Sequence, residues 1–138
     1  HPEYDREPAE KIAAQMRSPT YFLPETGIDG LMAAIGGAQA VLSMRLHAMI
    51  FAARMGVPGA GIVYDPKMES FLARMDMPSC GDVAGFTAQR AVDALNRVLD
   101  ARAAFVRHMQ AKNAALEKLA AENAAALKRL VCGEGEKK

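Results

Sequence analysis

Three polar residues stand at the start of an otherwise apolar helix predicted in the middle of the chain. Ser43, Arg45 and His47 follow the short apolar run 40–42, which predicts a buried strand. Ser43 is a candidate N-cap, because its hydroxyl can accept hydrogen bonds from N–H groups that the first helical turn leaves unpaired. Arg45 and His47 would lie in that first turn, where backbone donors and the helix dipole attract an anion. An arginine fork binds carboxylate or phosphate, and histidine exchanges protons near neutral pH, so this pattern indicates a site for a small acidic substrate.

A second polar group follows the next predicted strand, 60–64. It consists of Tyr64, Asp65 and Lys67, with Glu69 further along the same helix. Consecutive strands of a parallel sheet are commonly neighbours, and ligands bind at the carboxyl ends of such strands. We therefore expect the two groups to face one crevice, where Lys67 adds positive charge for a substrate carrying phosphate and carboxylate. Glu69 is expected to be an ordinary solvated helix residue.

Each of these residues also has a structural interpretation. Arg45 could pair with a carboxylate such as Asp29, and His47 could be a hydrogen-bonded histidine of the core. Asp65-Pro66 is a common helix start, with an acceptor at the N-cap and proline in the first turn, so Asp65 is expected to act as a cap. For Arg45 and His47 both interpretations stay open at this point.

Elements before residue 87 alternate between helix and strand. Apolar spacing predicts helices at 8–16, 28–35, 44–55 and 66–75, and strands at 21–23, 40–42 and 60–64. Gly56 should end the third helix in a left-handed conformation, and residues 77–86 predict a connecting loop. The alternation predicts an α/β fold, a Rossmann-like parallel sheet flanked by helices with its first strand missing upstream. Methionines at core-like positions are predicted to pack rather than to bind metal: Met44, Met49, Met55, Met68 and Met75.

Residues 87–131 contain neither glycine nor proline. Apolar residues recur at spacings of three and four from Val92 to Leu130, which predicts one seam along one or two long helices, with a break near Asp100. The small sheet unit cannot cover the whole seam, so we expect a partner: a domain absent from this chain, or a second copy in a homodimer through the 92–130 seam. The predicted organisation has three parts: an α/β unit at 1–86, a helical segment at 87–131 and a flexible tail at 132–138.

Composition excludes several classes of protein. Lys and Arg number 17 against 16 Asp and Glu, without the basic surplus typical of nucleic-acid-binding domains. Cys80 and Cys132 lie far apart without zinc-ligand spacing, so no metal site is predicted, and reduced thiols favour a cytoplasmic protein. No apolar run approaches the roughly 20 residues of a membrane-spanning helix, and no signal peptide is recognisable. Because the chain starts with His rather than Met, we expect it to be a fragment or a processed product.

The stretches that carry the two polar groups resemble a known family. Residues 43–58, SMRLHAMIFAARMGVP, and 61–72, GIVYDPKMESFL, are similar to the polysaccharide pyruvyl transferase family. That family's pattern has the form G-M-R-L-H-A-L-I-F-A, then G-V-P, then Y-D-P-K-V and F. The likeness is strongest to the branch that modifies bacterial cell-wall polymers. Ser43 stands where the family has Gly, and Met49 and Met68 where it has Leu and Val, so no polar group is lost.

The resemblance implies a two-domain fold like that of GT-B glycosyltransferases, with this chain as most of the carboxyl-terminal half. It implies an enzyme that transfers the pyruvyl group of phosphoenolpyruvate, as a ketal, to a sugar of a cell-wall polymer or exopolysaccharide, without a further cofactor. Arg45 matches the position implied to bind the phosphoenolpyruvate anion, and His47 an acid–base or phosphate-contacting position. The predicted catalytic pair is His47 and Arg45, and the predicted substrate-binding residues are Arg45, Ser43, Tyr64, Asp65 and Lys67.

The implied partners are phosphoenolpyruvate, a lipid-linked or polymeric saccharide acceptor, and the amino-terminal half of the same enzyme. The implied location is the cytoplasm, at the inner face of the cell membrane. Without its other half the chain is expected to be inactive, because a cleft that lacks one wall cannot exclude water. Two alternatives are a nucleotide-sugar-dependent GT-B glycosyltransferase half-domain and a helical dimerisation or interaction module built on the 92–130 seam.

Overall fold

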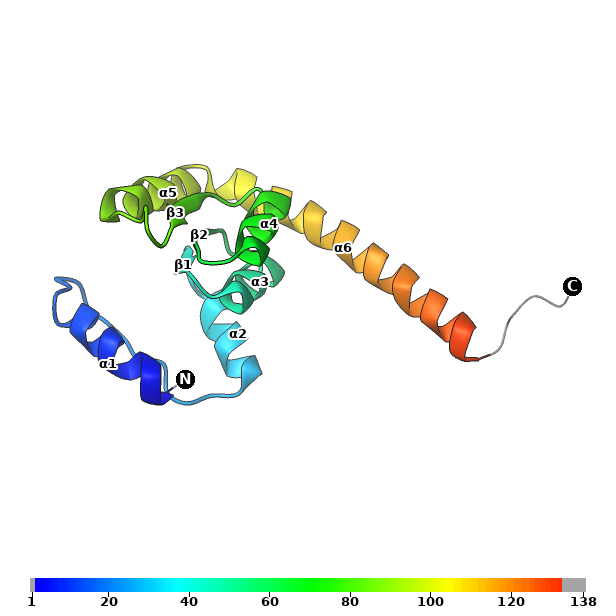
Figure 1. The fold of residues 1–138 in the computed structure, drawn as a ribbon, viewed down its shortest axis with the longest axis horizontal. Coiled ribbons are helices and arrows are strands. Elements are labelled where there is room, and N and C mark those ends of the chain that lie inside the picture. Colours follow the sequence, from blue (N-terminus) through cyan, green and yellow to red (C-terminus); the bar gives the residue numbers. More distant parts are fainter. Residues whose placement is uncertain (1, 133–138) are drawn as a thin grey trace, which may run out of the picture. The chain divides into compact units, whose positions relative to one another are not determined.

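The computed structural model describes residues 2–132 of the chain (Figure 1). Residues 133–138 of the predicted tail lie outside the described residues. By their contacts the residues form two units, His1–Ala34 and Ile35–Lys138. The elements in chain order are α1 (Pro2–Ala13), α2 (Ile28–Gly36), β1 (Val41–Ser43), α3 (Leu46–Arg54), β2 (Gly59–Val63), α4 (Pro66–Met75), β3 (Ser79–Asp82), α5 (Ala88–Asp100) and α6 (Arg102–Val131).

The first unit differs from the sequence prediction in two ways. Helix α1 begins at Pro2 and carries Pro8 in its interior, so the predicted start at Pro8 and end near residue 16 are wrong. Exposed ion pairs one turn apart, Arg6 with Glu10 and Glu7 with Lys11, favour the helix on both sides of the proline. The segment 21–23, predicted as a strand, is exposed and forms no strand, because a strand needs a neighbour to pair its backbone groups.

The second unit is built on a three-stranded parallel sheet with the order β1-β2-β3. Ser43 lies opposite Gly61, so the carboxyl ends of β1 and β2 are neighbours. Strand β3 falls inside the stretch predicted as a loop, and that prediction is wrong. Its sequence, Ser-Cys-Gly-Asp, has no apolar pattern, and hydrogen bonds to β2 define the strand instead: Gly61 N donates to Pro78 O, and Val83 N donates to Val63 O.

Helices pack on both faces of this sheet, because residues of β2 that point to opposite faces lie in different apolar clusters. Ala60 is wholly buried in a cluster with Cys80 of β3 and with Ala91 and Ala94 of α5. Val63, three residues on, packs against the larger cluster formed by α3, α4 and α6. Successive strand residues point to opposite faces, so α5 lies on one side and α3 with α4 on the other. The fold is therefore α/β, as predicted, while the two-domain GT-B arrangement remains a prediction.

The larger cluster is rich in methionine. Met49 of α3, Met68 and Met75 of α4, and Met109 of α6 have no exposed surface. The prediction that the methionines pack in the core is confirmed for Met49, Met68 and Met75, and it is wrong for Met44 and Met55, which are exposed. These two residues lie in the turn before α3 and at its carboxyl end, where the helix no longer faces the sheet.

Two glycines let this cluster sit directly on the backbone of β2. A Cβ at Gly61 would lie 2.6 Å from Leu72 Cδ1, and one at Gly59 would lie 2.8 Å from both Met49 Cε and the Val41 carbonyl oxygen. Both distances are shorter than side-chain packing allows, so a larger residue would force the Leu72 or Met49 side chain to move and, at Gly59, would also press on the backbone of β1.

The helices α5 and α6 are separated at Ala101, which confirms a break near Asp100. The residue before α6 is Ala101, which makes no side-chain cap bond. Thr87 is the N-cap of α5, since its Oγ1 accepts a hydrogen bond from Arg90 N at 3.2 Å.

Polar contacts fasten the first half of α6 to the carboxyl ends of α3 and α4. Asn113 Nδ2 donates to the Ala53 carbonyl at 2.6 Å, and this carbonyl also accepts from Gly56 N at 3.0 Å at the end of α3. Asp76, just after α4, accepts from Lys112 Nζ at 3.1 Å and pairs through the same oxygen with His108 Nε2. Both bonds to Asp76 favour its ionised form and hold the pKa of its carboxyl below the usual value of 3.8.

Gly56 confirms the predicted end of α3, since its φ of 68° is left-handed. We expect Gly56→Ala to lower the free energy of unfolding by about 1 kcal/mol, because a Cβ is disfavoured in this conformation. Gly56→Asn should lose less, since asparagine tolerates the same conformation. Urea unfolding followed by circular dichroism measures both changes, and equal losses in the two variants would contradict the backbone explanation.

The Asp76 contacts predict acid sensitivity. The Asp76 carboxyl has a lower pKa in the folded than in the unfolded chain, so its ionised form stabilises the fold above about pH 4. This stabilisation is lost as the pH falls through the pKa of the carboxyl in the folded chain. We expect the stability of wild type to decline more steeply below pH 4 than that of Asp76→Asn, which keeps a residue suited to φ 52°. Urea unfolding at pH 3 to 6 tests this, and parallel curves for the two proteins would refute it.

Candidate active site

The turn between β1 and α3 is closed by Ser43. Its Oγ accepts a hydrogen bond from Arg45 N at 2.9 Å and donates to the Arg45 carbonyl at 3.3 Å. Ser43 is therefore not the N-cap of α3, and that prediction is wrong: the residue before the helix is Arg45, in an extended conformation and without a side-chain cap bond. The serine hydroxyl holds the turn that determines where α3 starts.

This turn places the two predicted catalytic residues at the amino end of α3. Arg45 occupies the N-cap position, His47 is the second residue of the helix, and both are exposed. The first turn of α3 contains no acidic residue. The N–H groups of a first helical turn have no acceptor inside the helix, so this end combines backbone donors, a positive dipole end and a guanidinium. Such an arrangement attracts a phosphate or carboxylate.

Tyr64 and Asp65 lie at the carboxyl end of β2, beside the end of β3. Asp65 caps α4 as predicted, because its Oδ1 accepts from Met68 N at 2.9 Å and Pro66 opens the helix. A hollow of about 460 Å³ lies here, lined by Val63, Tyr64, Asp65, Pro66, Glu69, Ser79, Gly81 and Asp82. Asp65, Glu69 and Asp82 make this hollow acidic, which suits hydroxyl groups better than a second anion.

Lys67 lies at a different hollow, of about 390 Å³, together with Leu46 of α3 and Arg74 of α4. Leu46 directly follows Arg45, so the first turns of α3 and α4 adjoin the same depression. Two cations from α4 thus lie near the helix start that carries Arg45 and His47. Lys67 and Asp65 line separate hollows. The expectation that the polar groups after β1 and β2 face one crevice therefore stays a prediction.

Sequence reasoning missed the residues contributed by β3 and one from α4. Ser79 and Asp82 lie beside Asp65, and Asp82 Oδ1 accepts from Gly85 N at 2.6 Å, which shapes the loop after β3. The alternation of helix and strand was the available signal, since it called for a strand between α4 and α5. Arg74 carried no such signal, because a charged residue on an amphipathic helix is normally solvated.

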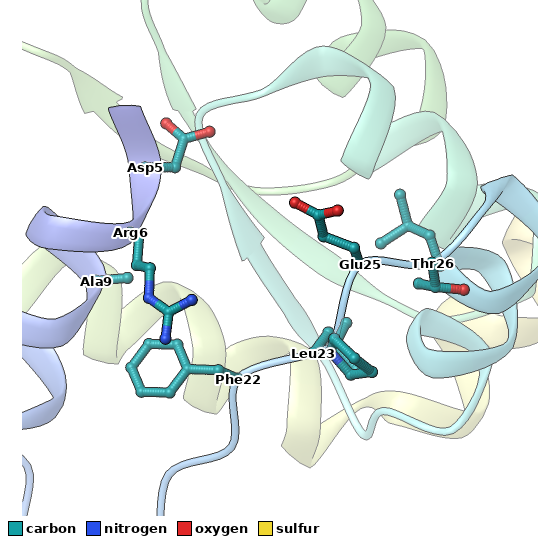
Figure 2. Close-up of a pocket in the computed structure, with 9 residues that line it drawn as sticks. Asp5, Arg6, Ala9, Phe22, Leu23, Glu25 and Thr26 are labelled. Atoms are coloured by element: carbon teal, nitrogen blue, oxygen red, sulfur yellow. The ribbon is translucent and has the colours of Figure 1, made fainter. Parts of the chain in front are cut away.

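A larger hollow, of about 840 Å³, belongs to the first unit and contains none of the predicted site residues. Figure 2 shows the Arg6 side chain reaching from α1 toward the ring of Phe22, with Asp5 on the same helix and Glu25 on the facing segment. Arg6 is paired with Glu10, and the acidic residues outnumber it. This hollow therefore lacks the positive charge that an anionic substrate requires, and its size alone assigns it no function.

The described residues offer no alternative centre based on metal or thiol chemistry. Residues 2–132 contain no group of three or more His, Cys, Asp or Glu side chains that could hold a metal ion. Burial raises the pKa of the Cys80 thiol, so the thiolate needed for nucleophilic attack is disfavoured. Within the same range no helix is both long and apolar enough to cross a lipid bilayer.

Fold and site together define an α/β protein with a cationic, anion-attracting helix start at the carboxyl edge of a parallel sheet. Residues 10–66 match the family described as polysaccharide pyruvyl transferase. The match contains Ser43, Arg45, His47 and Asp65, and it ends one residue before Lys67. Searches of curated proteins and of solved structures found no match.

Two substitutions distinguish the capping hydrogen bond of Asp65 from the effect of its negative charge. We expect Asp65→Ala to lower the free energy of unfolding by about 1 kcal/mol, because Met68 N loses its acceptor. Asp65→Asn keeps a side-chain oxygen in place, so its free energy of unfolding should lie within a few tenths of a kcal/mol of the wild-type value. Thermal and urea unfolding measure both variants. A loss in Asp65→Asn as large as that in Asp65→Ala would show that the oxygen acceptor is not what matters.

Proposed function

We propose that this protein transfers the pyruvyl group of phosphoenolpyruvate to two hydroxyls of a saccharide, forming a ketal and releasing phosphate, during synthesis of a cell-wall polymer or exopolysaccharide. The observation that carries the proposal is the position of Arg45 and His47 at the start of α3, inside the stretch that matches the pyruvyl transferase family. The match of residues 10–66 to this family supports pyruvyl transfer to polysaccharide in general. The donor is proposed from the charge of the site.

Phosphoenolpyruvate fits this helix start because it carries two anionic groups a few bonds apart. Arg45 offers a planar fork for one group, and the N–H groups of the first helical turn offer donors for the other. Lys67 and Arg74, at the adjoining hollow, add positive charge without an acidic residue in the first turn of α3 to oppose it. The acidic hollow beside Asp65 is suited to the hydroxyl-rich acceptor, which is why two depressions, rather than one, serve the reaction.

His47 is proposed as the general acid. It donates a proton to the methylene carbon of phosphoenolpyruvate, and the cationic centre that forms on the neighbouring carbon is captured by one sugar hydroxyl, which loses its proton. The C–O bond to phosphate then breaks, phosphate leaves with its electron pair, and a second hydroxyl adds and loses its proton. One released proton restores His47 and the other goes to phosphate, so the reaction consumes no cofactor. A positioned general acid contributes roughly 10²- to 10⁴-fold.

Substrate binding by Ser43 and Tyr64 follows from the same arrangement. The Ser43 hydroxyl holds the turn that presents Arg45, and the exposed ring of Tyr64 provides a surface for a sugar at the end of β2. A second domain facing this edge of the sheet, as in GT-B enzymes, would exclude water from the reacting groups. We propose a lipid-linked or polymeric acceptor, reached from the cytoplasm at the inner face of the membrane.

The proposal predicts that the full-length protein depends on Arg45. Arg45→Ala should lower kcat/KM for phosphoenolpyruvate by about 30- to 1,000-fold, because an ionic hydrogen-bond pair is worth roughly 2 to 4 kcal/mol. Arg45→Lys should remain well below wild type, since an ammonium cannot form the bidentate contact. Phosphate release in the presence of acceptor measures the rate.

Arg54→Ala is the matched control, because Arg54 lies at the opposite end of the same helix and pairs with Glu117. It should retain near-wild-type activity. Equal activity in Arg45→Ala and Arg54→Ala would exclude Arg45 from the site. Tight binding of a nucleotide sugar, with no effect of phosphoenolpyruvate, would instead favour a glycosyltransferase.

A further inference from the structure

Helix α6 is covered along its first half only. Met109 is wholly buried, and Leu116 packs against the same cluster, next to the sheet unit. From Glu117 to Cys132 every residue is exposed except Ala126. The exposed residues include four large apolar side chains, Leu119, Leu127, Leu130 and Val131, with exposed fractions of 56%, 62%, 82% and 76%. In Figure 1 this half of α6 is the orange-to-red stretch.

The exposed apolar side chains continue the buried face of the helix. With 3.6 residues per turn, Leu127 and Val131 lie in line with Met109 and Leu116, and Leu130 lies just beside them. The charged residues between 117 and 132 lie outside this apolar face, on its flanks or behind it: Glu117, Lys118, Glu122, Lys128 and Arg129. A helical segment of about 15 residues has only marginal stability in water unless its apolar face packs against a partner. We therefore expect a partner to cover this half of α6.

We propose that a second copy of this chain covers it, through antiparallel pairing of the two α6 helices about a two-fold axis at Asn123. This inference goes beyond the proposed function and does not depend on it. About the axis, residues equally far before and after Asn123 lie opposite one another. Leu119 then meets Leu127 of the second copy, and Leu116 meets Leu130. The alanines between them let the two helices approach closely.

The charges select the antiparallel direction. One flank of the apolar face carries Glu117 and Lys128, and the other carries Glu122 and Arg129, with the acid nearer the amino end in each case. In an antiparallel pair each flank faces its own equivalent, so Glu117 lies within one residue in height of Lys128 of the second copy, twice by symmetry. On the other flank the two copies of Glu122 lie near the axis, and each has Arg129 of the other copy five residues away. In a parallel pair the two flanks would face each other, so Lys128 of each copy would lie within one residue in height of Arg129 of the other, and the nearest charge to Glu117 would be Glu122, five residues away. The antiparallel pair therefore replaces two close base–base contacts with two acid–base contacts. Glu117 also pairs with Arg54 of its own chain, a contact that is exposed to solvent.

Asn123 is the single polar residue within the apolar face, and the two-fold axis gives it a partner. Two asparagine amides that meet at the axis can each donate to the other, which satisfies both groups inside the contact. A lone asparagine in such a seam fixes the register of pairing at a cost in stability. The same face suits a membrane surface poorly, because residues 117–131 contain no aromatic side chain and carry acidic as well as basic residues.

Sedimentation equilibrium of the 138-residue chain tests the proposal. The contact is small, so we expect dimers at roughly 100 μM and largely monomers at about 1 μM. Leu127→Asp should shift the chain to monomer throughout this range. Ala125→Asp adds the same charge on the opposite, charged face of the helix and should leave the dimer intact. Circular dichroism checks that both variants keep their helices. Monomeric wild type at the higher concentration, or equal effects of the two variants, would overturn the proposal.

The direction of pairing has its own test. Cys132 is exposed just after α6, and in a parallel dimer the two copies of it would be neighbours. In the antiparallel dimer they lie about 27 Å apart, so mild oxidation at 100 μM should yield little cross-linked wild type. The variant Asn123→Cys with Cys132→Ser brings two thiols together at the axis and should cross-link. Efficient cross-linking through Cys132 together with none at position 123 would overturn the antiparallel arrangement.

Discussion

The structure depends on the close approach of two helices to the backbone of one strand. Gly59 and Gly61 of β2 leave the space that Met49 of α3 and Leu72 of α4 fill, so both helices lie directly against the sheet. The methionine-rich cluster formed there is the larger apolar core of the second unit. Because α3 and α4 share this core, their first turns are held together at the carboxyl edge of the strands, where the polar residues are.

The same packing explains how an exposed site can be well positioned. Arg45 and His47 are at the surface, yet the turn before them is held by the Ser43 hydroxyl and by pairing of Ser43 opposite Gly61. At the other end of the helices, Asn113 and the pair of Asp76 with Lys112 tie α6 to the carboxyl ends of α3 and α4. The amino ends of α3 and α4 stay exposed at the edge of the sheet, while contacts with α6 hold their carboxyl ends.

Much of the fold could be predicted from local patterns. Apolar spacing predicted α2, α3 and α4, the Asp65-Pro66 pair predicted the start of α4, and Gly56 predicted the end of α3. These signals act over a few residues and need no distant partner, which is why they are legible in the sequence. Strand β3 and the extended segment 21–23 were mispredicted for the converse reason: a strand exists only where a neighbour pairs with its backbone.

The sequence by itself determined which residues could attract an anion, because Arg45 and His47 follow a strand and begin a helix whatever surrounds them. Tertiary structure alone decided that Ser43 holds the turn rather than caps the helix, that Lys67 and Asp65 line different hollows, and that Arg74 lies with Lys67 and Ser79 and Asp82 lie with Asp65. It also decided where along α6 the apolar face is covered. Such features depend on which elements meet in space, and contacts between residues far apart in the chain leave no local pattern to read.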